Sequence, residues 1–149
     1  MMKVLIWIVF FASSFIPSNI PPINQKIVDF VKSKEGKQID RGECWDLAKA
    51  ALDDAKADWA MPYEFGKRYD FKKDTILPGD IIQFENVVFR GELYSMSMPH
   101  HTAIVVDVLS HLKLKIAHQN FAGKRTVQFT EVNFNDLKKG KAQFYRPKE

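Results

Sequence analysis

Apolar residues recur with a helical period in two segments of the N-terminal half of the chain. The first segment begins after Pro21 and ends before Gly36, which predicts a helix over residues 22–34. The second predicts a helix from Cys44 to about Asp58, with charged residues on its other face. The apolar positions are Ile23, Ile27, Phe30 and Val31 in the first helix, and Leu47, Ala48, Ala51, Leu52 and Ala55 in the second.

The C-terminal half has the β-branched and alternating patterns of strands. We expect a strand over residues 80–84, a hairpin made of 101–108 and 112–120, and two further strands. Because the strands follow the helices without β-α-β alternation, the order predicts an α+β fold with an antiparallel sheet. The two further strands are 125–132 and 141–146, which bracket a short turn or helix at 135–139; residues 61–74 are expected to be a linker and 86–99 a long insertion.

Composition places the chain among single-domain globular proteins. It has 149 residues, of which 46% are hydrophobic and 27% charged. The formal net charge of +4 is compatible with anionic surfaces but is too small for a nucleic-acid-binding stripe, so we expect no nucleic-acid partner. We expect a monomer without a metal or organic cofactor.

The first residues have the layout of a secretory signal peptide. Lys3 precedes an unbroken apolar run from Val4 to Ala12, and small residues follow as far as Ser14. This predicts a leader over residues 1–14, extending at most to about 20, and a mature domain over 21–149 in a periplasmic or extracellular location. No stable membrane anchor is expected after cleavage. The alternative is an uncleaved N-terminal anchor.

Cys44 is the only cysteine and stands at the predicted start of the second helix. A disulfide within the chain and a cysteine-based zinc cluster are therefore excluded. A thiol is nucleophilic as the thiolate, which a helix N-terminus and a nearby imidazolium both favour. Cys44 is a candidate nucleophile on this ground, and the alternative is a buried, inert thiol.

The predicted hairpin brings two of the four histidines together. If Leu109 and Ser110 form a two-residue turn, His101 pairs directly with His118, and His101 becomes the candidate general base. A one-residue change of register would instead place Gln119 opposite His101 and turn His118 to the other face, which would leave the third catalytic role open. Asn120 shares the face of His118 and is the alternative orienting residue. The other two histidines are weaker candidates, since His100 should point to the opposite face and His111 lies at the turn.

Five ordered motifs resemble those of the CHAP and NlpC-like amidases and peptidases. They span about 105 residues and their specificity lies in the combination, because each motif alone is short. The motifs are Gly42-Glu43-Cys44-Trp45-Asp46-Leu47-Ala48, Leu77-Pro78-Gly79-Asp80-Ile81-Ile82-Gln83-Phe84, His100-His101-Thr102-Ala103-Ile104-Val105, His118-Gln119-Asn120 and Phe144-Tyr145-Arg146-Pro147.

The resemblance implies a papain-like α+β fold with helices packed on an antiparallel sheet. It places the nucleophile at Cys44 and the base at His101. The third catalytic position matches neither family fully. NlpC-like members have a histidine where this chain has His118, whereas many CHAP members have Glu-Gln-Asn where this chain has His118-Gln119-Asn120. The resemblance therefore implies His118 first and Asn120 second as the residue that orients His101.

The oxyanion hole and the substrate-binding residues are less well defined by sequence. The backbone N–H of Cys44 is the natural oxyanion donor, and Gln38, six residues upstream, is a candidate side-chain donor with an exposed loop residue as the alternative. Gln119 is a further substrate-side candidate. Trp45 and Tyr63 are expected either to contact substrate or to pack the helix against the sheet.

The sequence therefore predicts a secreted cysteine hydrolase of amide bonds that acts through an acyl-enzyme. The resemblance implies peptides or peptidoglycan as its substrates. One alternative is a catalytically silent binding module with the same fold. Another is a zinc site made by His101 and His118 with Asp107 or Cys44 as a third ligand.

Overall fold

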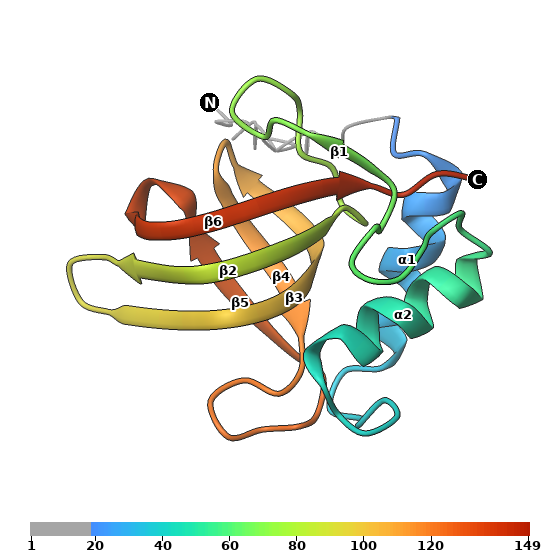
Figure 1. The fold of residues 1–149 in the computed structure, drawn as a ribbon, viewed down its shortest axis with the longest axis horizontal. Helices are drawn as coiled ribbons and strands as arrows, with labels where there is room; N and C mark the ends of the chain where they lie inside the picture. Colours follow the sequence, from blue (N-terminus) through green and yellow to red (C-terminus); the bar gives the residue numbers. More distant parts are fainter. Residues whose placement is uncertain (1–18) are drawn as a thin grey trace, which may run out of the picture.

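Two helices pack against one curved, six-stranded antiparallel sheet (Figure 1). The computed structural model describes residues 19–149, so the predicted leader over residues 1–14 lies outside the described residues. This architecture is the predicted α+β fold. The elements are α1 (Pro22–Ser33), α2 (Cys44–Ala55), β1 (Lys67–Tyr69), β2 (Ile81–Arg90), β3 (Ser95–Ser110), β4 (Lys113–His118), β5 (Gln128–Asn133), the 3-10 helix η1 (Phe134–Asp136) and β6 (Leu137–Arg146).

Both predicted helices form, and both bury the predicted apolar stripe. α1 begins at Pro22, whose fixed φ suits the first turn of a helix. α2 ends three residues earlier than predicted, because Lys56 adopts a left-handed φ of 59° and closes the helix. Within the described residues, none of the helices is long and apolar enough to cross a membrane.

The sheet has the strand order β1-β6-β2-β3-β4-β5, so β6, the last strand of the sequence, lies between β1 and β2. Residues 86–99 do not form the predicted insertion. They continue β2 and begin β3 as a long hairpin in which Arg90 pairs with Ser95. The predicted linker contains the short strand β1, which has no signal in the sequence because three residues are too few to show an alternation.

Apolar side chains pack on both faces of the sheet. One cluster lies between the helices and the sheet and includes Ile27, Leu52 and Phe65. The other is enclosed by the curved sheet and includes Phe84 and Phe144. Burial of both faces explains why β2 begins with four consecutive buried residues rather than with an alternation of buried and exposed ones.

The β3–β4 hairpin has a different register from the predicted one. Ile104 pairs with Ala117, whereas the predicted register would have paired it with Lys115. The turn lies at residues 111–112, two positions later than predicted, so next to the turn each residue of β3 pairs with a residue of β4 four positions later than predicted. Two irregularities in the ladder reduce this displacement of the pairing partner from four residues to two. Beyond the second irregularity the displacement is even, so His101 and His118 keep their predicted shared face.

A fully buried carboxylate, that of Asp80, joins four parts of the chain. It accepts two hydrogen bonds from the guanidinium of Arg146, at 2.9 and 3.0 Å, and one from the hydroxyl of Tyr69 at 2.6 Å. Asn24 Nδ2 and the backbone N–H of Leu77 donate to it as well. Asp80 therefore ties α1, β1 and β6 to the start of β2.

Removing this carboxylate should destabilise the fold strongly. We expect Asp80→Ala to lower the free energy of unfolding by about 3–5 kcal/mol, because the substitution leaves the charge of Arg146 without its buried partner. Urea denaturation measures the change, and Asp54→Ala, at an exposed position of α2, is the matched control with an expected change within about 0.5 kcal/mol. Equal stability of the two variants would contradict this role for Asp80.

Candidate functional site

Cys44 is the first residue of α2, as predicted, and its position is set by the loop before it. Gly42 has a left-handed φ of 81°, and a Cβ at this position would lie 2.8 Å from the Cβ of Arg125. Only glycine therefore allows the turn that places Cys44 at the start of the helix. The backbone N–H of Glu43 donates to the carboxylate of Asp46 at 3.1 Å and so helps to close the first turn.

Gln119 holds this loop in place from the end of β4. Its side chain is fully buried, donates to the carbonyls of Ile39 and Glu43 at 2.9 and 2.8 Å, and accepts from the N–H of Ile39 at 3.1 Å. The Gln119 amide is thus fully occupied by backbone groups. It positions the start of α2, and the predicted contact with substrate is not supported by its placement.

His101 and His118 are hydrogen-bonded to each other in the interior. His101 Nε2 and His118 Nδ1 are 2.9 Å apart, and the two rings meet edge to face. His118 Nε2 lies 2.8 Å from the hydroxyl of Thr130 on β5. The two histidines are diagonal rather than direct neighbours across the β3–β4 ladder, since the observed register places Ala103 opposite His118.

Asn120 has a different environment from His118. Its Nδ2 donates to the Glu43 carboxylate at 2.8 Å, and Arg125 Nη1 pairs with the other oxygen of that carboxylate at 2.7 Å. The amide of Asn120 therefore contacts the residue before Cys44 rather than His101. Of the two candidate orienting residues, the structure brings His118 to His101 and leaves Asn120 at the mouth of the site.

A cavity of about 930 Å³ opens over Cys44 and His101, whose side chains both line it. Trp45, Tyr63 and Asn120 also line this cavity, whereas Gln38 does not. Gln38 is exposed, and its Nε2 donates to the carbonyl of Asp40, so the structure offers no support for its predicted oxyanion role. Whether Gln38 is an oxyanion donor or an exposed loop residue depends on the path of the loop before α2. That path has no local signal in the sequence.

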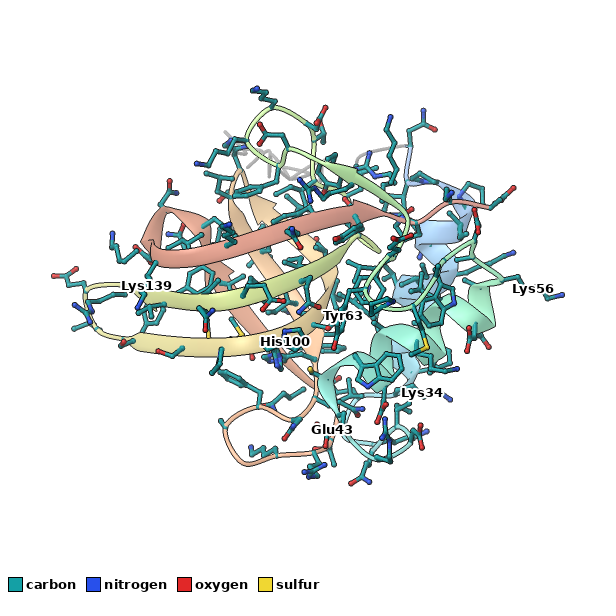
Figure 2. The ribbon with its side chains drawn as sticks, in the orientation of Figure 1. Lys34, Glu43, Lys56, Tyr63, His100 and Lys139 are labelled. Carbon is teal, nitrogen blue, oxygen red and sulfur yellow. The ribbon has the colours of Figure 1, made fainter. Side chains whose placement is uncertain are left out.

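Tyr63 and His100 lie at the rim of the cavity. The rings of Tyr63 and His100 are 4.9 Å apart, and Figure 2 shows them next to each other where the β2–β3 hairpin approaches α2. His100 Nδ1 lies within 3.0 Å of the Glu85 carboxylate and points away from the buried face, as predicted. Both side chains are exposed at the opening of the cavity that they line.

Burial keeps the reactive groups of the resting site uncharged. It raises the pKa of the Cys44 thiol, against the opposing effect of hydrogen bonds from Thr102 and Trp45. Burial also lowers the pKa of His101 to about 4 and that of His118 to about 3, and the charged form of each ring is disfavoured further by a neighbouring histidine. These shifts favour a neutral thiol and neutral imidazoles over an ion pair of Cys44 thiolate and His101 imidazolium.

Three residues of the site were not predicted from the sequence. Thr102 contacts Cys44 and donates its hydroxyl proton to Gln83 at 2.6 Å, Thr130 closes the hydrogen-bond chain behind His118, and Arg125 neutralises Glu43. Thr102 directly follows His101 and belongs to one of the five motifs. Thr130 had no local signal, because its relevance depends on the pairing of β4 with β5.

The described part of the chain contains no group of three or more His, Cys, Asp or Glu side chains placed to hold a metal ion. The zinc alternative needed His101, His118 and a third ligand. His118 uses both ring nitrogens in hydrogen bonds to His101 and Thr130. The donor arrangement therefore does not support that alternative.

Comparison with known proteins identifies the family. Residues 22–149 match the family model described as the AIM3/BBC1 cysteine proteinase-fold domain. The chain belongs to this family. The AIM3/BBC1 domain thus includes both helices, all six strands and every candidate residue of the site.

A curated relative agrees with this assignment. Altered inheritance of mitochondria protein 3 from Debaryomyces hansenii is 29% identical in an alignment that is 171 residues long, gaps included, and that covers 91% of this chain. The chain covers 18% of the length of that relative, so it corresponds to a small part of a much larger protein.

Two solved structures share the fold. The crystal structure of Ly7917 superposes with a TM-score of 0.52 at 16% identity, covering 82% of this chain and 62% of that one. Ly7917 with the hydrolyzing product of MDP gives a TM-score of 0.54 at 18% identity, covering 83% of this chain and 63% of that one. These likenesses show the papain-like cysteine proteinase fold of the AIM3/BBC1 domain.

The two buried histidines should make stability depend on pH. Below pH 6.5 the unfolded chain binds protons on both rings, whereas the folded chain binds them only near pH 4 and pH 3. The contribution of the two histidines to the free energy of unfolding should therefore be fully present above pH 6.5. It should fall by up to about 1.4 kcal/mol per pH unit for each histidine as the pH drops from 6.5 to 4.

Urea denaturation at a series of pH values measures this slope. His118→Asn should reduce the slope, and His111→Asn, at the exposed turn, should leave it unchanged. The same slope in all three proteins would show that the buried pair is not its source.

Proposed function

We propose that this AIM3/BBC1 domain is a cysteine hydrolase of amide bonds in which Cys44 is the nucleophile and His101 the general base. The observation that carries the proposal is the combination of Cys44 at the start of α2 and His101 on the wall of the same cavity, with His101 Nε2 held 2.9 Å from His118 Nδ1. The order of the motifs also supports a finer placement among CHAP and NlpC-like proteins.

The hydrogen-bond chain fits His101 for the role of base. When His118 Nε2–H donates to Thr130 and His101 Nε2–H donates to His118, the free lone pair of His101 is on Nδ1. This tautomer leaves Nδ1 able to accept a proton. His118 acts as an orienting residue and Thr130 supports its ring.

The reaction starts from the neutral pair. The Cys44 thiol passes its proton to His101 as the sulfur bonds to the carbonyl carbon of the substrate, and the proton then goes to the leaving amine as the C–N bond breaks. Water then attacks the acyl carbon as His101 accepts its proton, the C–S bond breaks to release the acid, and His101 returns the proton to the Cys44 sulfur. The Cys44 backbone N–H, in the first turn of α2, has no acceptor within the helix and is the proposed oxyanion donor.

The proposed substrates are peptides or peptidoglycan. The family description names a cysteine proteinase fold, which favours a peptide amide, and one Ly7917 structure holds the hydrolyzing product of MDP, which favours hydrolysis as the reaction. The peptidoglycan class comes from the resemblance of the five motifs to CHAP and NlpC-like proteins. Secretion of a monomeric domain to a periplasmic or extracellular location is a further part of the proposal and depends on a leader at residues 1–14. N-terminal sequencing of the exported protein tests that part.

A second candidate function is a catalytically silent binding domain. The observation that favours it is the neutral resting site, since burial raises the pKa of Cys44 and lowers the pKa of His101. The reaction above does not need a preformed ion pair, so activity distinguishes the two candidates.

Replacing the nucleophile should abolish turnover without unfolding the domain. We expect Cys44→Ala to remove hydrolysis of a peptide library and of purified peptidoglycan while its thermal unfolding stays close to that of the wild type, because Cys44 is only partly buried. Amine release measures turnover, and His111→Ala is the control that should retain it. Equal hydrolysis by the Cys44 variant would rule out the nucleophile, and no hydrolysis by the wild type would favour the silent domain.

The third position can be assigned by comparing His118 with Asn120. We expect His118→Ala to lower kcat by roughly 10²-fold or more, since His101 loses the hydrogen bond that sets its tautomer. Asn120→Ala should leave kcat of the same order, because its amide contacts Glu43 instead. Steady-state kinetics on the substrate found above measures both values, and the reverse ranking would assign the orienting role to Asn120.

A further inference from the structure

The sheet has an incompletely paired edge far from the cavity over Cys44. β6 pairs with β2 along most of its length, but β1 covers only its last part, from Phe144 to Arg146. Within the described residues, the stretch 137–143 therefore has a strand partner on one side alone. Figure 1 shows β1 alongside the C-terminal half of β6, while the N-terminal half runs on without a neighbour on that side.

A turn directs the chain away from this edge. After Tyr69 the backbone N–H groups of Lys73 and Asp74 both donate to the carbonyl of Asp70, so the chain turns instead of extending β1. Because alternate residues of a strand point their N–H and C=O groups to opposite sides, part of the backbone at 137–143 has no ladder partner. Such an edge is a template for one more strand.

A groove of about 780 Å³ lies along this edge. One wall is the end of β1 with the following turn, and the other is β6. None of its lining residues lines the cavity over Cys44, so the two sites are separate. The groove is lined by Arg68, Tyr69, Asp70, Phe71, Lys72, Leu137, Gly140, Lys141, Ala142 and Gln143.

The charge of the groove is positive. Arg68, Lys72 and Lys141 line it, and within residues 19–149 none of them lies at ion-pair distance from an acidic side chain. The acidic lining residue is Asp70, whose carboxylate is 3.6 Å from Lys73 Nζ and accepts from the N–H of Lys72. The three free cations therefore determine the potential in the groove.

We infer that this groove binds an extended acidic peptide segment of a partner, which adds to the sheet as a strand beside residues 137–143 of β6. Backbone hydrogen bonds to the free edge provide the affinity, as in other cases of strand addition. The cations provide the specificity, because lysine on an edge strand disfavours pairing with neutral or basic strands and favours a strand that carries carboxylates.

Two peptides of equal charge test the inference. One is an extended peptide that alternates glutamate with threonine, and the other has the same sequence with N-methyl groups on alternate backbone amides, which removes strand pairing and keeps the charge. Binding is measured with Cys44→Ala, so that no peptide is consumed and the result does not depend on the proposed hydrolysis.

We expect the unmodified peptide to bind, the N-methylated peptide to bind at least about tenfold more weakly, and amide exchange to slow at residues 137–143. Equal binding of the two peptides, or protection elsewhere in the chain, would overturn the inference. A polyphosphate chain that binds as tightly as the unmodified peptide would also overturn it, because polyphosphate has no backbone amides for strand pairing.

Charge reversal provides the matched variants. The double variant Lys72→Glu with Lys141→Glu should weaken binding of the unmodified peptide by roughly tenfold or more. Lys26→Glu with Lys32→Glu, at exposed positions of α1, changes the net charge equally and should leave the affinity of the same order. The same loss in both double variants would mean that only net charge attracts the peptide, which would contradict a specific groove.

Discussion

The buried carboxylate of Asp80 is the constraint on which the arrangement of this domain depends. Its side chain binds Arg146, Tyr69 and Asn24, and its backbone carbonyl accepts from the N–H of Val105 at 2.8 Å. The backbone contact fixes where β2 meets β3, four residues from His101. A charge inside a protein is stable only when it is fully paired, so the chain must bring these elements together. The carboxylate thus holds α1, β1 and β6 on β2, and the separate backbone contact aligns β3, which carries the candidate base His101.

The candidate site combines backbone constraints with uncharged chemistry. Gln119 holds the loop before α2 and His118 holds His101, and these two residues are next to each other at the end of β4. The same short segment thus positions both halves of the Cys44 and His101 pair. Burial that provides this rigidity also keeps the thiol and the imidazoles neutral. In the proposed reaction, bonding of the sulfur to a substrate carbonyl therefore accompanies proton transfer from Cys44 to His101.

The sequence predicted what depends on local periodicity and missed what depends on irregular geometry. The limits of α1, the start of α2 at Cys44 and the shared face of His101 and His118 follow from spacing alone. The β3–β4 register was wrong by two residues, because irregularities in the ladder are set by packing and have no pattern in the sequence. The placements of Gln38 and Asn120 and the contact from Thr130 depend on loop path and on strand pairing, which become apparent only in three dimensions.

In the proposed reaction Cys44 carries the acyl group of the substrate, and this intermediate can be trapped. The protein is mixed briefly with an activated acyl ester of a peptide and its mass is measured. We expect a transient adduct with the mass of the acyl group on Cys44, which accumulates and then decays in the wild type and is absent from Cys44→Ala. An adduct that forms equally on both proteins, or turnover without any adduct on Cys44, would contradict it.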